Sequence, residues 1–274
     1  MKRICATLMV ALLLVGMAAG AALAKPGELV ISTTTSTQDS GLLDYLLPLF
    51  EKASGLKTKV IAVGTGAAIE MGRRGDADVL LVHARAQEDK FVADGFAVQR
   101  YDVMYNDFYI VGPAADPAKI KGKNAAEAFK AIADAQATFV SRADKSGTNT
   151  KELEIWKKAG ITPKGAWYVE AGTGMGDVLL MSSEKGAYTL TDRATYLAFK
   201  DKIKLAVLVS GESTLFNPYG ILPVNPAKFP SVNAAGAKQF VEWMTSPATQ
   251  KLIGQFGVDK YGQQLFIPDA KPAK

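Results

Sequence analysis

The sequence predicts an α/β protein with a mainly parallel sheet and with a second lobe inserted into the first. Three observations carry this prediction. Strand-like apolar runs alternate with helix-like runs through the N-terminal third of the chain, which is typical of a parallel sheet covered by helices. Two distant segments share a pattern of aromatic residues, asparagine and proline. Further α/β units lie between these segments and would form the inserted lobe.

The N-terminal unit is predicted as strand, helix, strand, helix, strand. Its apolar runs and amphipathic spacings place these elements at 28–31, 42–52, 59–63, 67–73 and 78–82. Ligands of open α/β sheets bind at the carboxyl ends of strands, beside the first turns of helices. We therefore expect any ligand at the ends of these strands.

The two similar segments are YNDFYIVGP at 105–113 and FNPYGILPVNP at 216–226. We interpret them as extended crossovers that carry the chain from one lobe to the other and back. Two unrelated edge strands closed by proline are the alternative. With crossovers, the first lobe comprises 25–106 and 217–274, and the second comprises 107–216.

Helix and strand signals continue through both lobes. The second lobe is predicted to hold helices at 124–134, 148–159 and 176–183 and a strand at 138–141. After the second crossover, helices at 232–245 and 247–256 would return to the first lobe. Asp192 is expected to cap a helix.

Residues 1–24 have the layout of a secretory signal peptide. Lys2 and Arg3 precede an apolar run that ends in Ala22-Leu23-Ala24, an A-x-A cleavage pattern. We expect cleavage after Ala24 and a free, soluble protein in the periplasm. A retained membrane anchor is the alternative, but an anchor would stay bulky where this run ends in alanine and glycine.

Cysteine usage and charge limit the function classes. The only cysteine, Cys5, lies in the leader, so the exported chain would have neither a disulfide nor a lipid-bearing cysteine. Loss of the leader lowers the formal net charge from +5 to +3. Without a basic run, this charge does not indicate a nucleic-acid partner. It is compatible with an anionic ligand.

Loop one, residues 33–37, places hydroxyl side chains between a strand and a helix. Helix starts offer backbone N–H groups to anions, and hydroxyls add neutral donors. Asp39 and Ser40 are candidate caps of the following helix. Because threonine also favours strands and caps, a purely structural role is the alternative. The candidate anion-binding residues here are Thr33, Thr34, Thr35 and Ser36.

Loop two, VGTGAA at 63–68, is a second strand-to-helix junction. Its glycines would let backbone amides approach a ligand, which makes Thr65, Gly66 and Ala67 candidate binding residues. The third glycine of a dinucleotide-binding fingerprint is missing. A tight turn without function is the alternative.

Loop three, SRADKSGTNTKE at 141–152, is a third such junction. Arg142 offers a fixed charge with planar donors, and Ser146, Gly147 and Thr148 offer hydroxyl and amide donors at a helix start. A surface pair of Arg142 with Asp144 and an ordinary cap are the alternative. Loop four, EAGTGMGD at 170–177, either lines the cleft or only turns the chain.

Catalytic motifs are sparse. The single histidine, His83, cannot furnish a zinc site, and we interpret it as a hydrogen-bonded residue at the edge of the cleft. Neither a G-x-S-x-G sequence nor a GK[ST] ending occurs. Ser36 and Ser146 have no evident histidine partner, so an exported enzyme acting on phosphorylated substrates is a weakly supported alternative.

Together, TTTSTQDSGLLDYLLPLFEKASG, VGTGAA, GDADVLLVHA, SRADKSGT and WYVEAGTGMGDVL resemble the periplasmic tungstate-binding proteins of bacterial ABC importers over nearly the whole exported chain. The resemblance implies a type II periplasmic-binding-protein fold whose two lobes close on a tetrahedral oxyanion. It implies tungstate or molybdate as ligand and, as partners, a membrane permease with its ATPase subunit. We expect a monomeric binding protein without catalytic activity, cofactor, resident metal or nucleic-acid partner.

The family's TTTS motif binds the anion and corresponds to the run from Thr33 to Ser36. The arginine of its SR-x-D-x-SGT motif corresponds to Arg142, and the hydroxyls of this motif correspond to Ser146 and Thr148. Ala143 departs from the pattern, because glycine is expected there.

The chemistry of the cargo leaves alternatives. Tungstate, molybdate and sulfate are deprotonated near neutral pH and need only donors, whereas phosphate retains a proton and favours a site with an acceptor. If Asp39 or Asp144 points into the cleft, phosphate becomes the better ligand. Only the resemblance favours tungstate over molybdate, and an importer component for phosphate or sulfate stays an alternative.

Overall fold

Strands β1 (Glu28–Thr34), β2 (Lys57–Val63) and β3 (Val79–Val82) run parallel, with β1 in the middle. They belong to a computed structural model that describes residues 27–270. The expected leader, with its cleavage site after Ala24, lies outside the described residues. The predicted β-α-β-α-β unit is confirmed, with α2 (Leu42–Ser54) and α3 (Thr65–Arg74) as its helices.

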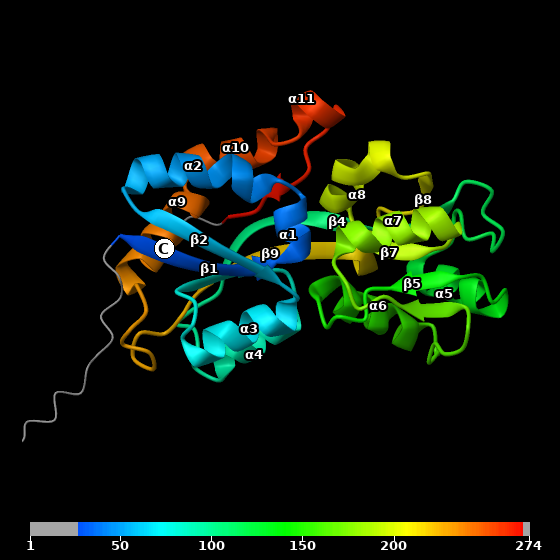
Figure 1. Cartoon of the computed structure of the whole chain (residues 1–274), viewed down its shortest axis with the longest axis horizontal. Helices are drawn as coiled ribbons and strands as arrows, with labels where there is room; N and C mark the ends of the chain where they lie inside the picture. The colour runs from blue at the N-terminus through cyan, green and yellow to red at the C-terminus, as the bar shows by residue number, and fades with distance from the viewer. Residues whose placement is uncertain (1–26, 271–274) are drawn as a thin grey trace, which may run out of the picture.

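Helices cover both faces of this sheet (Figure 1). Helix α2 lies with α9 and α10 on one face, and α3 lies with α4 on the other. The sequence did not predict α4, because the buried face of this helix includes Glu88 and hides the apolar spacing. The bounds of these helices are Arg85–Ala93 for α4, Ala234–Thr245 for α9 and Pro247–Gln255 for α10.

The two expected crossovers are strands β4 (Tyr101–Pro113) and β9 (Phe216–Pro223), which pair antiparallel. Asn106 lies opposite Asn217 in this pairing, so the repeated asparagine of the two sequence segments meets its counterpart. Strand β9 also pairs with β3, while the far half of β4 pairs with strands of the second lobe. Figure 1 shows β4 and β9 running from one lobe into the other.

The expectation of a mainly parallel sheet is wrong. The pairings of β9 with β3 and of β4 with β9, β7, β8 and β10 are all antiparallel. Crossovers that leave one lobe and return must run in opposite directions, which makes the sheet mixed. The C-terminal elements are α11 (Val258–Tyr261) and β10 (Ile267–Pro268).

The second lobe has its own sheets and helices. Strands β7 and β8 flank β4, and β5 pairs parallel with β6. The strands are β5 (Phe139–Ser141), β6 (Tyr168–Glu170), β7 (Thr189–Asp192) and β8 (Leu205–Val209). The helices are α5 (Ala125–Asp134), α6 (Gly147–Lys158), α7 (Met175–Lys185) and α8 (Arg193–Phe199), with 3-10 turns at Lys200–Lys202 and Ser213–Leu215. Asp192 caps α8, as expected.

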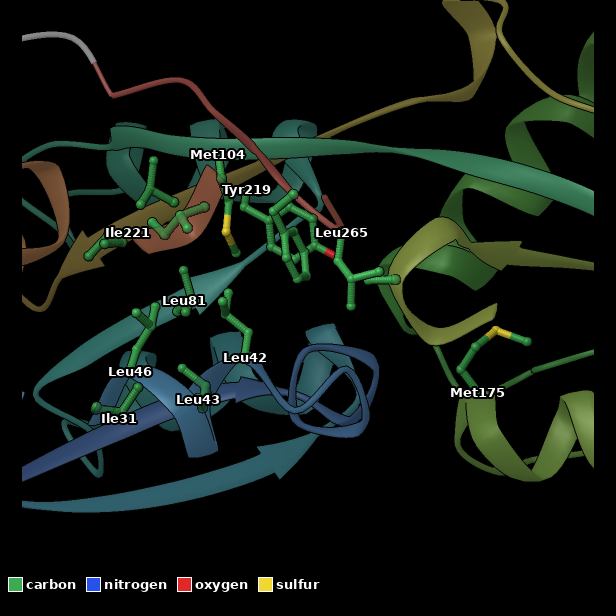
Figure 2. Close-up of a cluster of buried hydrophobic side chains, with 14 of the residues drawn as sticks. Ile31, Leu42, Leu43, Leu46, Leu81, Met104, Met175, Tyr219, Ile221 and Leu265 are labelled. Carbon is green, nitrogen blue, oxygen red and sulfur yellow. The ribbon is translucent and has the colours of Figure 1, made fainter. Parts of the chain in front are cut away.

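Each lobe has a buried core. Leucines of α2 face β1 and β3, and side chains of the crossovers lie beside them, as Figure 2 shows for Leu42, Leu43, Leu46, Ile31, Leu81, Met104, Tyr219 and Ile221. In the second lobe, the Trp156 ring lies 4.3 Å from Phe129 and 5.3 Å from Phe139. Because β4 and β9 belong to both lobes, the division at 106/107 and 216/217 stays a prediction.

Two substitutions should distinguish the packed core of the first lobe from its surface by their effects on stability. Phe240 of α9 is fully buried, and its ring lies 5.2 Å from Phe50 in an edge-to-face contact. Phe240→Ala should lower the free energy of unfolding by about 3–5 kcal/mol, measured by urea denaturation. Leu49→Ala, on the exposed side of α2, should change it by less than about 1 kcal/mol. Equal effects of the two variants would contradict this account of the core.

Candidate functional site

Loop one is not a loop. Thr33 and Thr34 end β1, and Thr35 begins the short helix α1 (Thr35–Asp39). The Thr34 hydroxyl caps this helix by accepting the Thr37 N–H at 3.2 Å, which is how threonine commonly starts a helical turn. A helix of this length has no apolar periodicity, so the sequence did not reveal it. Helix α1 lies where the two lobes meet (Figure 1).

The expected cap at Asp39 or Ser40 is wrong. Gly41, with φ at 79°, is the residue that precedes α2. Ser40 still contributes, because its hydroxyl accepts the Leu42 N–H at 3.3 Å. Asp39 is the last residue of α1 and accepts a hydrogen bond from the backbone N–H of Gly176 in the other lobe.

Hydroxyls of the TTTS run point in different directions. Thr33 Oγ1 donates to the carbonyl of Leu81 at 2.7 Å, inside the sheet. Thr34 Oγ1 and Ser36 Oγ lie 3.1 Å apart and both contact His83. Thr35 Oγ1 faces the second lobe, where it meets Arg142. These residues are therefore close in space, but their side chains have different partners.

Arg142 is the most unusual buried group of the cleft. Its side chain is 1% exposed, and its Nη2 donates to Thr35 Oγ1 at 2.8 Å and to Asp144 Oδ2 at 2.5 Å. Within residues 27–270, Nε and Nη1 of Arg142 have no hydrogen-bond partner, and neither has the buried hydroxyl of Thr148. Unpartnered buried donors are rare in folded proteins, so each of these atoms lacks an acceptor that a bound ligand could supply.

Loop three combines a capped helix start with one residue in the left-handed region. Ser146 caps α6 by accepting the Asn149 N–H at 3.1 Å. Ala143 has φ at 49°, in the left-handed region that glycine favours. Alanine can adopt this conformation at a modest cost, and Arg142 is still directed into the cleft. The expected pair of Arg142 with Asp144 exists, but it is buried and not on the surface.

The lobes touch around this corner. The Gly147 N–H donates to Thr65 Oγ1 at 2.7 Å, and the Gly66 N–H donates to the carbonyl of Lys145 at 3.3 Å. The N–H of Gly66 thus bonds the other lobe, and Ala67 is exposed. Loop four also contacts the first lobe, because Gly174 lies beside Thr35. The described form of the cleft is closed.

Each acid near Arg142 accepts hydrogen bonds from the protein, although only Asp192 is fully buried. Burial raises the pKa of the Asp39 carboxyl, and the Gly176 N–H and the charge of Arg142 oppose this effect. Burial also raises the pKa of Asp192, whose oxygens accept bonds from the backbone N–H and the hydroxyl of Thr195 at 2.9 and 2.7 Å. Asp144 accepts from Arg142 and from the Ser146 N–H at 3.1 Å.

Sequence reasoning underestimated His83. This residue follows β3, is 4% exposed, and lies with Nε2 at 3.0 Å from Ser36 Oγ and 3.1 Å from Thr34 Oγ1. The expectation that Ser36 lacks a histidine partner is therefore wrong. Burial lowers the pKa of His83 to about 4, helped by the positive charge of Arg142 and opposed by the hydrogen bond to Asn217. The only available signal was the position of His83 at the carboxyl end of a predicted strand.

No helix of the described chain, residues 27–270, combines the length and apolar character needed to cross a bilayer. In that part of the chain, no three side chains of His, Cys, Asp or Glu gather in a way that could hold a metal ion.

Comparison with known proteins places this geometry in a family. A family model described as a PBP superfamily domain matches residues 19–248. The chain belongs to the PBP superfamily. Within it, the chain is 53% identical over 247 residues to "Tungstate-binding protein TupA" of Peptoclostridium acidaminophilum, covering 89% of this chain and 86% of the relative. This identity places both proteins in one family, and the expected two-lobed fold of type II is confirmed.

Solved structures agree with this assignment. The structure described as the tungstate ABC transporter from Geobacter sulfurreducens has 60% identity and a TM-score of 0.77, covering 84% of this chain and 98% of that one. The tungstate-binding protein TupA from Desulfovibrio alaskensis G20 has 48% identity and a TM-score of 0.75, covering 89% and 99%.

Closure of the cleft depends on Gly64, the residue that precedes α3. A Cβ there would lie 2.8 Å from the backbone oxygen of Asp144 in the other lobe, although its φ of −65° and ψ of 151° suit alanine. Gly64→Ala should leave each lobe folded and keep the cleft open. With saturating tungstate, the anion named for the relatives, its radius of gyration by small-angle X-ray scattering should exceed that of the wild type.

Gly174→Ala is the matched control, because Gly174 precedes α7 in the other lobe and its added Cβ would lie 3.7 Å from the nearest atom of Thr35. This variant should compact like the wild type. If Gly64→Ala compacts equally well, the steric account of closure is incorrect.

Proposed function

We propose that the protein is a periplasmic substrate-binding protein that captures tungstate, and molybdate as well, between its two lobes and delivers it to an ABC importer. The observation that carries the proposal is the set of buried, unpartnered donors in the closed cleft of residues 27–270: Nε and Nη1 of Arg142 and the hydroxyl of Thr148. An oxyanion would accept hydrogen bonds from all of them.

Two further hydroxyls can donate to the same ligand. A guanidinium and a backbone N–H can only donate, so Thr35 Oγ1 accepts from Arg142, and Thr65 Oγ1 accepts from Gly147. Each threonine therefore keeps its own hydroxyl proton for another acceptor. Donors from both lobes would meet at one anion, which is how a ligand can hold the two lobes together.

The site favours an anion without protons. Phosphate near neutral pH carries a proton and needs an acceptor, whereas the unpartnered buried atoms of Arg142 among residues 27–270 are donors. The carboxylates of Asp39, Asp144 and Asp192 are bonded to donors of the protein. An anion that offers only acceptors, such as tungstate, molybdate or sulfate, leaves no proton without a partner. The phosphate alternative is therefore the weaker one, and the names of the relatives favour tungstate over sulfate.

A hydrolytic enzyme is the second candidate, because Ser36, His83 and Asn217 are linked by hydrogen bonds like a nucleophile, a base and an orienting group. Two facts oppose it. A histidine whose pKa lies at about 4 is a weak base at neutral pH. Its Nε2 is also shared between Thr34 and Ser36. We propose binding without turnover and expect no hydrolysis of p-nitrophenyl phosphate above the uncatalysed rate.

The remaining parts of the proposal concern the cellular context. The protein would act in the periplasm after cleavage behind Ala24, as a monomer. Its closed form would dock on a membrane permease, and an ATPase subunit would drive release and import. We propose the same binding residues that the sequence indicated. The contacts described above support Thr35, Thr65, Arg142 and Thr148 in particular.

Titration calorimetry with four anions tests the proposed ligand. Tungstate should bind most tightly to protein dialysed free of anions, molybdate should bind as well, and sulfate and phosphate should bind weakly. If phosphate binds most tightly, the assignment of Asp39, Asp144 and Asp192 to internal partners is wrong. If none of the four binds, the proposed function fails.

Arg142→Ala tests the charged donor. Loss of a charge-assisted contact should weaken tungstate binding by about 1.5–3 kcal/mol in the same titration. Arg74→Ala is the control, since it removes an equal charge from an exposed arginine paired with Asp76. This variant should bind within about twofold of the wild type. An unchanged affinity of Arg142→Ala would remove the arginine from the site.

A further inference from the structure

The ring of His83 contacts both the hydroxyl run and a crossover strand. Nε2 contacts the hydroxyls of Thr34 and Ser36, and Nδ1 lies 2.9 Å from Oδ1 of Asn217 on β9. Asn217 in turn donates from Nδ2 to Oδ1 of Asn106 on β4 at 2.7 Å. Hydrogen bonds thus link the anion-binding run to both crossover strands through one side chain.

These bonds fix where the proton of the ring lies. Asn217 uses its Nδ2 toward Asn106, so the atom that faces His83 is a carbonyl oxygen, which only accepts. Nδ1 of His83 therefore carries the proton. Because burial keeps the ring neutral at physiological pH, Nε2 carries no proton and accepts a hydrogen bond from the hydroxyl of Thr34 or Ser36.

The ring also contacts the second lobe. A Cβ added to Gly147, the first residue of α6, would lie 2.9 Å from the carbonyl oxygen of His83 and 3.0 Å from its Cε1 and Nδ1. The Tyr219 ring stacks on the imidazole at 4.6 Å. His83 is thus held between a crossover strand and a helix start that reaches it in the closed form.

We propose that His83 is a positioning residue for anion capture: its unprotonated Nε2 orients the hydroxyls of Thr34 and Ser36 and ties that orientation to the crossover strands. The inference rests on the proposed oxyanion-binding function. A hydroxyl that is already oriented loses less freedom when the anion arrives, which increases affinity. The specific consequence is that one of these two hydroxyls donates to His83 while the other keeps its proton for the anion, beside the donors of Thr35, Thr65, Thr148 and Arg142.

The tautomer can be measured directly, because His83 is the only histidine in the chain. In 15N-labelled wild-type protein, long-range 1H–15N spectra would contain the signals of one imidazole only. Any affinity tag must therefore lack histidine. Between about pH 5.5 and 8, we expect a protonated Nδ1, an unprotonated Nε2 and a shift of the Nε2 signal on addition of tungstate. A protonated Nε2, or an Nε2 signal that tungstate does not move, would overturn the proposal.

Variants test the effect on binding. His83→Asn keeps a donor near the position of Nδ1 but removes the acceptor for Thr34 and Ser36, and it should weaken tungstate binding at least about tenfold. His83→Gln places a carbonyl oxygen near the position of Nε2 and should recover most of the affinity. Equal affinities of His83→Asn and wild type, or equal losses in both variants, would refute the role of the acceptor.

Tyr196→Phe is the control, because it removes a buried tyrosine hydroxyl that donates to the carbonyl oxygen of Leu205 at 3.0 Å, within the second lobe. It should bind tungstate within about twofold of the wild type. Thermal unfolding of each variant would identify any that do not fold, and the spectra of the wild type do not depend on the variants. Absence of tungstate binding by the wild type would instead count against the proposed function.

Discussion

The closed cleft depends on the burial of one positive charge. A guanidinium removed from water is costly unless its donors and its charge are matched, and Asp144 and Thr35 satisfy only Nη2 of Arg142. Among residues 27–270, its Nε and Nη1 lack partners. Closure without an anion would leave these donors unsatisfied, whereas closure on an oxyanion would pair them. The same group thus opposes closure of the empty cleft and favours closure of the loaded one.

The crossover strands connect the two lobes between which Arg142 is buried. Strands β4 and β9 pair with each other and extend into both lobes, so a change in the angle between the lobes must pass through them. Asn106 and Asn217 face each other in this pair, next to the His83 ring. Hydrogen bonds at this position connect both crossover strands, through His83, to the hydroxyls of Thr34 and Ser36.

The sequence predicted the elements with strong periodicity and missed those without it. The first β-α-β-α-β unit, both crossovers and the capped helices α5, α6 and α10 follow from apolar spacing and turn residues. Helix α1 is too short to have a period, and α4 buries Glu88. The relative direction of the paired strands was predicted incorrectly, because pairing between distant strands is not encoded in local patterns.

The candidate site was predictable to the level of segments, not of contacts. The strand-to-helix junctions indicated Thr35, Thr65, Arg142 and Thr148 as candidates, and the resemblance indicated Thr35, Arg142 and Thr148 as well. Nothing in the local sequence distinguishes Thr33, whose hydroxyl bonds Leu81 inside the sheet, from Thr35, whose hydroxyl faces the other lobe. His83 lies far from Ser36 in the sequence, so their contact follows only from the pairing of β3 with β1.

Because the chain leaves the first lobe and returns to it, the strands of the second lobe are all synthesised before the last strands of the first lobe. Strands β4, β7 and β8 of the second lobe are all present once residue 209 has emerged. The first lobe begins earlier but lacks β9, α9 and α10 until the last part of the chain is made. At that length the chain has all strands of the second lobe and lacks only its last buried side chain, Leu215, whereas the β3 edge of the first lobe stays open until β9 is made. Since unpaired strand edges promote aggregation, the first lobe is the part of this protein that most needs protection before synthesis ends.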